Sequence, residues 1–269
     1  MRAFRTAFPL FRRVVAGLSA GTIACTIAGS VVGVAIAQDD DGIPDVAYPA
    51  LPASGATVEA FVPKGWRLEH RVDGDLNKDG KPDAVLVLRD NDPANIIDND
   101  GMGPDRFDTN PRMLAVLFAQ PSGYSLALEN HTLIPRADNP VMDDYLDGDD
   151  AVQVRRGAFT VSLHSWASAG TWYTSSTTFT FRHQDGCFRL IGYDSNEAHR
   201  GSGETTVTSV NYATGKATVE YGNFSSDDPA EKVAAKVKRK PLPCLQDIDD
   251  GFGFDPGIEA PARKGGEGE

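Results

Sequence analysis

Oxygen-bearing side chains recur at alternate positions in a loop that leads into the apolar segment 84–88. Oxygens at the first, third and fifth positions of a loop, followed by a glycine such as Gly80, match the first half of a calcium-binding loop. Calcium prefers hard oxygen ligands, and the glycine permits the bend that turns these oxygens inward. The ligands predicted by this spacing are the side chains of Asp75, Asn77, Asp79 and Asp83 and the backbone carbonyl of Lys81.

The glutamate that completes an EF-hand is missing from this loop, because Leu86 takes its position. The loop is therefore typical of a calcium loop that runs directly into a strand. The alternative is a tight turn in which Asp and Asn side chains bond to nearby backbone amides and no metal is needed. We favour calcium, because an oxygen-rich loop of an exported protein meets abundant calcium.

The second candidate is a stretch of small residues flanked by aromatic ones, Ser165–Tyr173. Such a loop can protrude and enter a narrow cleft while its aromatic side chains anchor it. The alternative is an ordinary hairpin in which Trp166, Trp172 and Tyr173 pack on a sheet. Composition alone favours that alternative.

Residue patterns that would indicate catalysis are weak. The five histidines show no His-x-x-x-His spacing for a metal. The neighbours His164 and Ser165 point to opposite faces of a strand, so they do not pair as base and nucleophile. We therefore expect a protein that is not an enzyme.

The first 37 residues have the features of an export signal. Four arginines precede an uncharged apolar or small stretch that ends at Ala35-Ile36-Ala37, with small residues at the positions a signal peptidase reads. We predict cleavage after Ala37 and a periplasmic protein. One alternative is an uncleaved anchor, because about 24 apolar residues can span a bilayer. Another is an outer-membrane lipoprotein processed at Cys25.

The chain is acidic, with 26 Lys and Arg against 38 Asp and Glu and a net charge of −12. Residues 1–37 hold four of the bases and no acid, so residues 38–269 carry a net charge of −16. Nucleic acid is excluded as a partner, because nothing here neutralises a row of phosphates. An acidic surface would instead speed the encounter with a basic protein.

Cleavage after Ala37 would leave two of the three cysteines, Cys187 and Cys244, in an oxidising compartment. An even pair in such a compartment is a candidate disulfide. Two buried free thiols are the alternative.

Short apolar or alternating segments follow one another through most of the chain and predict one antiparallel all-β domain. The clearest predicted strands and hairpin turns are 84–88, 114–118, 159–163, 179–181, 207–212 and 217–221, with turns at 184–186 and 213–216. Asp228–Glu231 has the capping residues of a helix start, and 232–240 could continue as helix or as a basic edge strand.

Composition divides the chain into four parts. We expect a signal peptide at 1–37, a Pro- and Gly-rich linker at 38–60, the all-β domain at 61–245 and a flexible acidic tail at 246–269. The strand pattern leaves a sandwich, a barrel and a small propeller open for the domain.

Three stretches of the chain resemble one family: GDLNKDGKPDAVLVL, NPRMLAVLF and SWASAGTWYTSSTTFTFRHQDGCFRLIGYDSNEAHRGSGE. Together they are similar to periplasmic inhibitors of invertebrate-type lysozyme. They resemble more specifically the immunity proteins that are paired with a peptidoglycan hydrolase of a bacteria-killing type IV secretion system. The first stretch also resembles the calcium loop of FG-GAP repeats.

The resemblance implies a propeller-like all-β fold, an early calcium loop and a protruding inhibitory loop. That loop would plug the cleft of a lysozyme-like peptidoglycan hydrolase and contact its catalytic acid. The residues that match the inhibitory loop are Ser168, Ala169, Gly170, Thr171, Trp172 and Tyr173. The competing hypothesis is a calcium-stabilised β module that binds cell wall or glycan, with Trp166 and Trp172 stacked on sugar.

Overall fold

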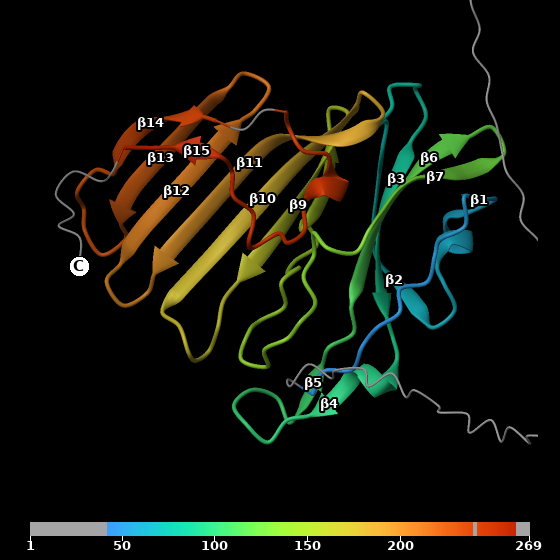
Figure 1. The fold of residues 1–269 in the computed structure, drawn as a ribbon, viewed down its shortest axis with the longest axis horizontal. Coiled ribbons are helices and arrows are strands. Elements are labelled where there is room, and N and C mark those ends of the chain that lie inside the picture. The colour runs from blue at the N-terminus through green and yellow to red at the C-terminus, as the bar shows by residue number, and fades with distance from the viewer. Residues whose placement is uncertain (1–41, 239–240, 262–269) are drawn as a thin grey trace, which may run out of the picture. The chain divides into compact units, whose positions relative to one another are not determined.

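Antiparallel strands form almost all of the regular structure in the computed structural model (Figure 1). They make a five-stranded sheet, an eight-stranded sheet and a two-stranded ribbon, and neither large sheet closes into a barrel among the described residues. The prediction of an antiparallel all-β domain is confirmed at this level. The described chain also has three short 3₁₀ helices, η1 (Val58–Phe61), η2 (Pro93–Asn95) and η3 (Leu245–Asp247).

The structure describes residues 42–238 and 241–261, which belong to the unit Asp41–Glu269. Within these ranges, no helix is long and apolar enough to cross a lipid bilayer. Some of the sequence-based predictions lie outside the described residues: the export signal with Cys25, the first residues of the predicted linker and the end of the predicted tail, at 1–37, 38–41 and 262–269.

The five-stranded sheet has the order β1-β7-β6-β3-β2. Its strands are β1 (Ser54–Gly55), β2 (Trp66–Gly74), β3 (Asp83–Asp90), β6 (Arg112–Gln120) and β7 (Gly123–Asn130). The central strands β3 and β6 are continuous apolar runs, because side chains on both faces of this sheet are buried.

The eight-stranded sheet follows the order of the sequence, from β8 at one edge to β15 at the other. Its strands are β8 (Val152–Arg155), β9 (Ala158–Ser165), β10 (Tyr173–Gln184), β11 (Cys187–His199), β12 (Glu204–Asn211), β13 (Lys216–Asn223), β14 (Glu231–Val237) and β15 (Ile258–Glu259). The ribbon consists of β4 (Ile96–Asp98) and β5 (Arg106–Asp108).

Both predicted hairpin turns occur in the eight-stranded sheet. Asp185 and Gly186, with φ of 53° and 78°, form the two-residue turn between β10 and β11. Positive φ at both positions gives a turn whose twist matches that of the strands it joins. Gly215, with φ of 68°, lies in the turn between β12 and β13.

Two apolar clusters hold the domain together. The larger one lies between the two large sheets and contains, among others, Val85, Leu114, Val116, Phe159, Phe179, Phe181, Phe188 and Leu190. The smaller one lies on the other face of the five-stranded sheet and contains Leu51, Val58, Phe61, Ala84, Leu86, Leu88, Met113, Ala115 and Leu117. Each large side chain buried in this way stabilises the fold by about 1.5–3 kcal/mol.

The described part of the predicted linker, residues 42–60, is part of the folded domain. Leu51 and Val58 are buried, and β1 pairs with β7. The folded domain therefore begins before the predicted domain boundary at residue 61. The reason is that the outer face of the five-stranded sheet is apolar and this segment covers it. The Pro- and Gly-rich composition predicted a linker, but Leu51 and Val58 pack in the smaller apolar cluster.

The described part of the predicted flexible tail, residues 246–261, also packs on the domain. Ile248 is buried, and the ring of Phe254 lies 5.4 Å from that of Phe179. The segment crosses the eight-stranded sheet and ends as β15, paired with β14 (Figure 1). Apolar residues spaced between acids and glycines supply this packing, and composition alone did not reveal it.

The predicted helix start at Asp228–Glu231 is wrong, since Glu231–Val237 is strand β14. Val233, Ala235 and Val237 lie on the more buried side of the strand and alternate with more exposed residues. This period of two belongs to a strand, and pairing with β13 outweighs the local capping signal. The strand alternative holds for 232–237, although β15 and not β14 forms the edge.

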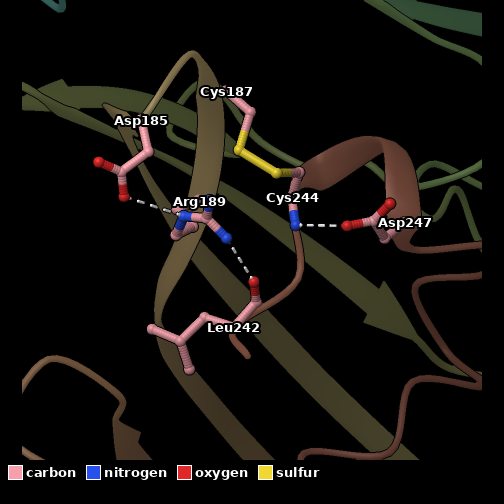
Figure 2. Close-up of a disulfide and its surroundings, with 6 residues drawn as sticks. All are labelled: Asp185, Cys187, Arg189, Leu242, Cys244 and Asp247. Atoms are coloured by element: carbon pink, nitrogen blue, oxygen red, sulfur yellow. Dashed lines mark hydrogen bonds and ion pairs between the residues drawn. A yellow bond between two sulfur atoms is a disulfide. The ribbon is translucent and has the colours of Figure 1, made fainter. Parts of the chain in front are cut away.

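Cys187 in β11 and Cys244 before η3 form a disulfide (Figure 2). The bridge joins residues 57 positions apart. Closing a loop of that length in the unfolded chain stabilises the folded state by about 4 kcal/mol. Arg189 donates from Nη1 to the carbonyl oxygen of Leu242 at 2.8 Å, and the N–H of Cys244 donates to Asp247 at 2.8 Å. These contacts hold the C-terminal segment against β11.

Candidate functional site

The segment 166–172 joins β9 to β10 at one end of the eight-stranded sheet (Figure 1). Its aromatic side chains near β10 face solvent, since Trp172 is 64% exposed and Tyr173 is 53% exposed. At the tip, Gly170 has φ of +84°, and no heavy atom lies within 4 Å of the position that a Cβ would take. The structure thus shows a loop with two exposed rings and an open tip rather than a hairpin with both rings packed on the sheet.

Tyr173 is the first residue of β10 and pairs with His199, the last residue of β11. The two rings meet edge to face, with centroids 4.8 Å apart. Among the described residues, the Tyr173 hydroxyl has no hydrogen-bond partner. It is therefore available to an acceptor on another molecule.

The N-terminal half of the loop is held by the segment 141–143. The N–H of Asp143 donates to the carbonyl oxygen of Trp166, and the N–H of Ser168 donates to that of Val141, each at 2.9 Å. Met142 and Ala167 form an isolated antiparallel bridge. Backbone pairing with this segment therefore supports the N-terminal half of the loop.

The C-terminal half of the loop is held by Arg200, in the turn that follows β11. Nη2 of Arg200 donates to the carbonyl oxygens of Ala167 at 2.8 Å and Thr171 at 2.7 Å. Its backbone N–H donates to the carbonyl oxygen of Trp172 at 2.8 Å. The guanidinium also lies 4.8 Å from the ring centroid of Trp166, within reach of a cation–π interaction. One side chain thus contacts both ends of the loop.

A partly buried ion-pair network ties the segment that supports the loop to the five-stranded sheet. Arg112 of β6 donates to the carboxylate of Asp144 with Nη1 and Nη2, each at 2.7 Å, and also binds Glu69 of β2. Arg89 of β3 lies 3.4 Å from Glu69 and 3.6 Å from Asp144. Because Asp144 follows Asp143 directly, the network anchors the chain that pairs with the loop.

Two carboxylates of the network, Glu69 and Asp144, have lowered pKa values. Burial by itself would raise the pKa of Glu69 and of Asp144, but the hydrogen bonds and charge of Arg112 outweigh burial. Arg89 lowers both pKa values further. The network is therefore fully charged at neutral pH and weakens when acid protonates its carboxylates.

The loop lines an open concavity of about 380 Å³. Its lining residues are Ser168, Ala169, Gly170, Thr171, Trp172 and Arg200. No acid or histidine is among these lining residues, so the concavity lacks the base that would activate a serine nucleophile. One exposed indole, several small residues and one guanidinium suit this surface to binding.

The acidic loop before β3 is closed by its own side chains. The carboxylate of Asp75 accepts from the N–H groups of Asp79 at 3.1 Å and Gly80 at 3.0 Å. The side chain of Asn77 accepts from Asp79, and Asp79 accepts from the N–H of Lys81, each at 2.9 Å. The Lys81 bond also lowers the pKa of Asp79. This is the pattern of the Asx-capped turn.

Asp83 holds the same loop from its buried side, since Asp83 is 0% exposed. One oxygen accepts from the N–H groups of Leu76 at 2.9 Å and Asn77 at 3.2 Å, and the other accepts from Ala119 of β6 at 2.8 Å. Asp83 thus connects the loop to the neighbouring strand.

The predicted calcium ligands fit a cation only in part. The oxygens of Asp75, Asn77 and Asp79 are of the type calcium prefers, and a carboxylate oxygen that accepts one hydrogen bond retains a further lone pair. Asp83, however, is committed to three backbone amides. Among the described residues, no group of three or more His, Cys, Asp or Glu side chains is placed to hold a metal ion.

Arg200 and the network around Arg112 are the contributors that the sequence-based reasoning missed. Arg200 is 33 positions from Ala167, and the pairing of β10 with β11 brings them together. The sequence signal that could have located Arg200 near the loop is the residue pairing of the β10–β11 hairpin. Counting outward from the turn at Asp185-Gly186 places the start of β10 beside the residues just before Arg200.

Comparisons of the chain with protein-family models, with curated proteins and with solved structures found no match.

Proposed function

We propose that the protein is an exported immunity protein that inhibits a lysozyme-like peptidoglycan hydrolase by inserting the loop Ser168–Tyr173 into its active-site cleft. The observation that carries the proposal is the exposure of Trp172 and Tyr173 on a loop that is held at both ends. Exposed aromatic side chains on a preorganised loop are typical of residues that dominate binding energy.

An inhibitor of this kind needs shape and preorganisation and no reaction of its own. The small residues at 168–170 let the backbone approach the floor of a narrow cleft. The hydroxyl of Tyr173 can then donate to a catalytic carboxylate of the enzyme. The net charge of −16 on residues 38–269 favours encounter with a basic enzyme, such as one adapted to an anionic cell wall.

The cellular location and the bound cation belong to the same proposal. Residues 1–37 would direct the protein to the periplasm, and lipidation at Cys25 would instead attach it to the outer membrane. Ca²⁺ would bind at the acidic loop through Asp75, Asn77, Asp79 and the carbonyl of Lys81, and lock the loop against β3. We extend the proposal to the finer architecture, a small propeller-like or sandwich domain.

A turbidity assay tests the inhibition directly. The exported protein is purified, mixed with a panel of muramidases and other lysozyme-like hydrolases, and added to peptidoglycan. We expect at least one enzyme to be slowed. Substituting Trp172→Ser or Gly170→Trp should weaken that inhibition by about 30-fold, the loss typical of a residue central to an interface.

The matched control is Met102→Ser, on the β4–β5 ribbon, because Met102 is 66% exposed and resembles Trp172 in exposure. This variant should inhibit as the wild type does. The proposal fails if no enzyme of the panel is slowed. It also fails if Trp172→Ser and Met102→Ser inhibit equally well.

The exposure of Trp172 also supports a second candidate, a module that binds cell wall or glycan without inhibiting an enzyme. An exposed indole can stack on a sugar ring. Sedimentation of the protein with insoluble peptidoglycan, in the absence of any hydrolase, separates the two functions. Co-sedimentation that is lost in Trp172→Ser, together with no inhibition, would replace the inhibitor proposal.

A further inference from the structure

The inhibitory loop has few contacts of its own near its tip. Its N-terminal half pairs with the segment 141–143, and the carbonyl oxygens of Ala167, Thr171 and Trp172 accept hydrogen bonds from Arg200 in the β11–β12 connection. Within the loop, the N–H of Tyr173 donates to the hydroxyl of Thr171 at 3.1 Å. Each residue of a loop that becomes ordered loses conformational entropy. Something outside the loop must therefore compensate for this entropy loss.

Arg200 can compensate for this entropy loss, because its side chain bonds to the loop backbone from the turn after β11. Its guanidinium is planar and carries several N–H donors in a fixed fork, so it can bond to carbonyls that come from different directions. Nη2 bridges the carbonyl oxygens of Ala167 and Thr171, which lie on opposite sides of the tip. Nε lies 3.4 Å from the carbonyl oxygen of Trp172. Hydrogen bonds to a charged donor contribute more to stability than neutral ones do.

The neighbours of Arg200 in the turn complete the support. A Cβ on Gly201 would lie 3.6 Å from Cδ2 of Trp172 and 3.1 Å from Cε1 of His199, so the glycine leaves room for both rings. Nδ1 of His199 accepts from the N–H of Ser202 at 3.0 Å, which holds the imidazole in position. The ring of His199 in turn meets that of Tyr173.

We propose that Arg200 is the positioning residue of the inhibitory loop, clamping the carbonyls of Ala167, Thr171 and Trp172 so that the two exposed rings are presented in one fixed arrangement. This inference rests on the proposed function for its biological consequence. The clamp itself is a property of the free protein and is measurable without any partner.

Limited proteolysis with chymotrypsin measures the clamp, because this protease cleaves after exposed aromatic residues. Sites are identified by mass spectrometry of the fragments. In Arg200→Gln, cleavage after Trp172 and Tyr173 should accelerate by about tenfold, as expected for loss of roughly 1.4 kcal/mol of local stability. Cleavage after Phe224, which is also exposed, serves as the internal reference and should not change.

Two further variants sharpen the measurement. Arg200→Lys keeps the charge but loses the fork, so its loop should be cleaved nearly as fast as that of Arg200→Gln. Arg155→Gln, at the end of the edge strand β8, is the matched control for removing an arginine from the same sheet and should behave as wild type. Wild-type resistance in both Arg200 variants would overturn the clamp.

Inhibition of the target hydrolase, measured on the same variants, separates this inference from the proposed function. Faster cleavage and weaker inhibition in Arg200→Gln support both. Faster cleavage with a wild-type protein that inhibits no enzyme supports the clamp and contradicts the function. Weaker inhibition with unchanged cleavage would overturn the positioning role, because Arg200 would then act by contacting the enzyme directly.

Discussion

The acidic loop at 75–83 and the aromatic loop at 166–173 both connect neighbouring strands, but different parts of the chain hold them. The acidic loop folds on its own side chains, and Asp83, only a few residues on, fastens it to β6. The aromatic loop has no carboxylate, and Arg200 from another hairpin holds its carbonyls. Its rings are left exposed, whereas the fastening group of the acidic loop is buried.

This difference separates a loop that maintains structure from one that is free to act on a partner. A loop whose polar groups bond to one another leaves few N–H groups free for a protein partner. A loop whose backbone carbonyls are held by a side chain from another hairpin can keep its shape while its own side chains face solvent. We therefore propose a stabilising role for the first loop, with calcium as its proposed ligand, and a recognition role for the second.

The largest effect is expected at Asp83. Substituting Asp83→Ala leaves three N–H groups in a buried site without their acceptor and should lower the free energy of unfolding by about 3–6 kcal/mol. Urea denaturation followed by tryptophan fluorescence measures the change. The control Asp79→Ala, in the exposed part of the same loop, should cost far less than Asp83→Ala does. Equal costs would mean that burial does not distinguish the two aspartates.

Calcium should act on the first loop and leave the second unchanged. At about 10 mM Ca²⁺, a site of the affinity found in extracellular modules would stabilise the fold by about 1–3 kcal/mol. We expect a chelator to lower the Tm of wild type and to have no effect on Asp75→Ala. A wild-type Tm that is insensitive to calcium would leave the Asx-capped turn as the full account of this loop.

Acid should weaken the ion-pair network that supports the second loop. The pKa values of Glu69 and Asp144 are lowered in the folded state, so the unfolded chain binds protons first as pH falls. Their stabilisation is complete above the ordinary carboxylate pKa near 4 and is lost as pH falls further toward the lowered folded-state values.

Unfolding curves in urea at pH 7, 5 and 3 test this expectation. Asp144→Asn should show a smaller decrease in stability between pH 5 and pH 3 than wild type does. An identical decrease in both proteins would show that the network does not govern the acid response.

Of these substitutions, we expect one at Trp172 to have the smallest effect on the free energy of unfolding. We expect the same substitution to have the largest effect on inhibition. Because its side chain is mostly exposed, Trp172→Ser should change the free energy of unfolding by no more than about 0.5 kcal/mol. Thermal unfolding measures this change next to the inhibition assay. A large loss of stability would make the ring part of the core and would remove the contrast between the loops.

Local patterns in the sequence were enough for much of the sheet architecture. The apolar run Ala84–Leu88 and the turn at Asp185-Gly186 predict β3 and the β10–β11 hairpin, because burial and backbone twist are encoded within a few residues. The same reasoning failed at 228–231, where a helix-capping signal competes with strand pairing that comes from β13. It also failed at both ends of the domain, where sparse apolar residues such as Leu51 and Phe254 pack against distant strands.

For the candidate sites, the sequence by itself determined which segments carry unusual chemistry: an oxygen-rich loop, a small-and-aromatic loop and an even pair of cysteines. The tertiary structure alone decided that Asp83 turns inward to three amides, that Trp172 turns outward, and that Arg200 holds the aromatic loop from the next hairpin. The physical reason is that side-chain type is a local property. Burial, and the partner that satisfies each polar group, depend on strands that are far apart in the chain and meet only in the folded sheets.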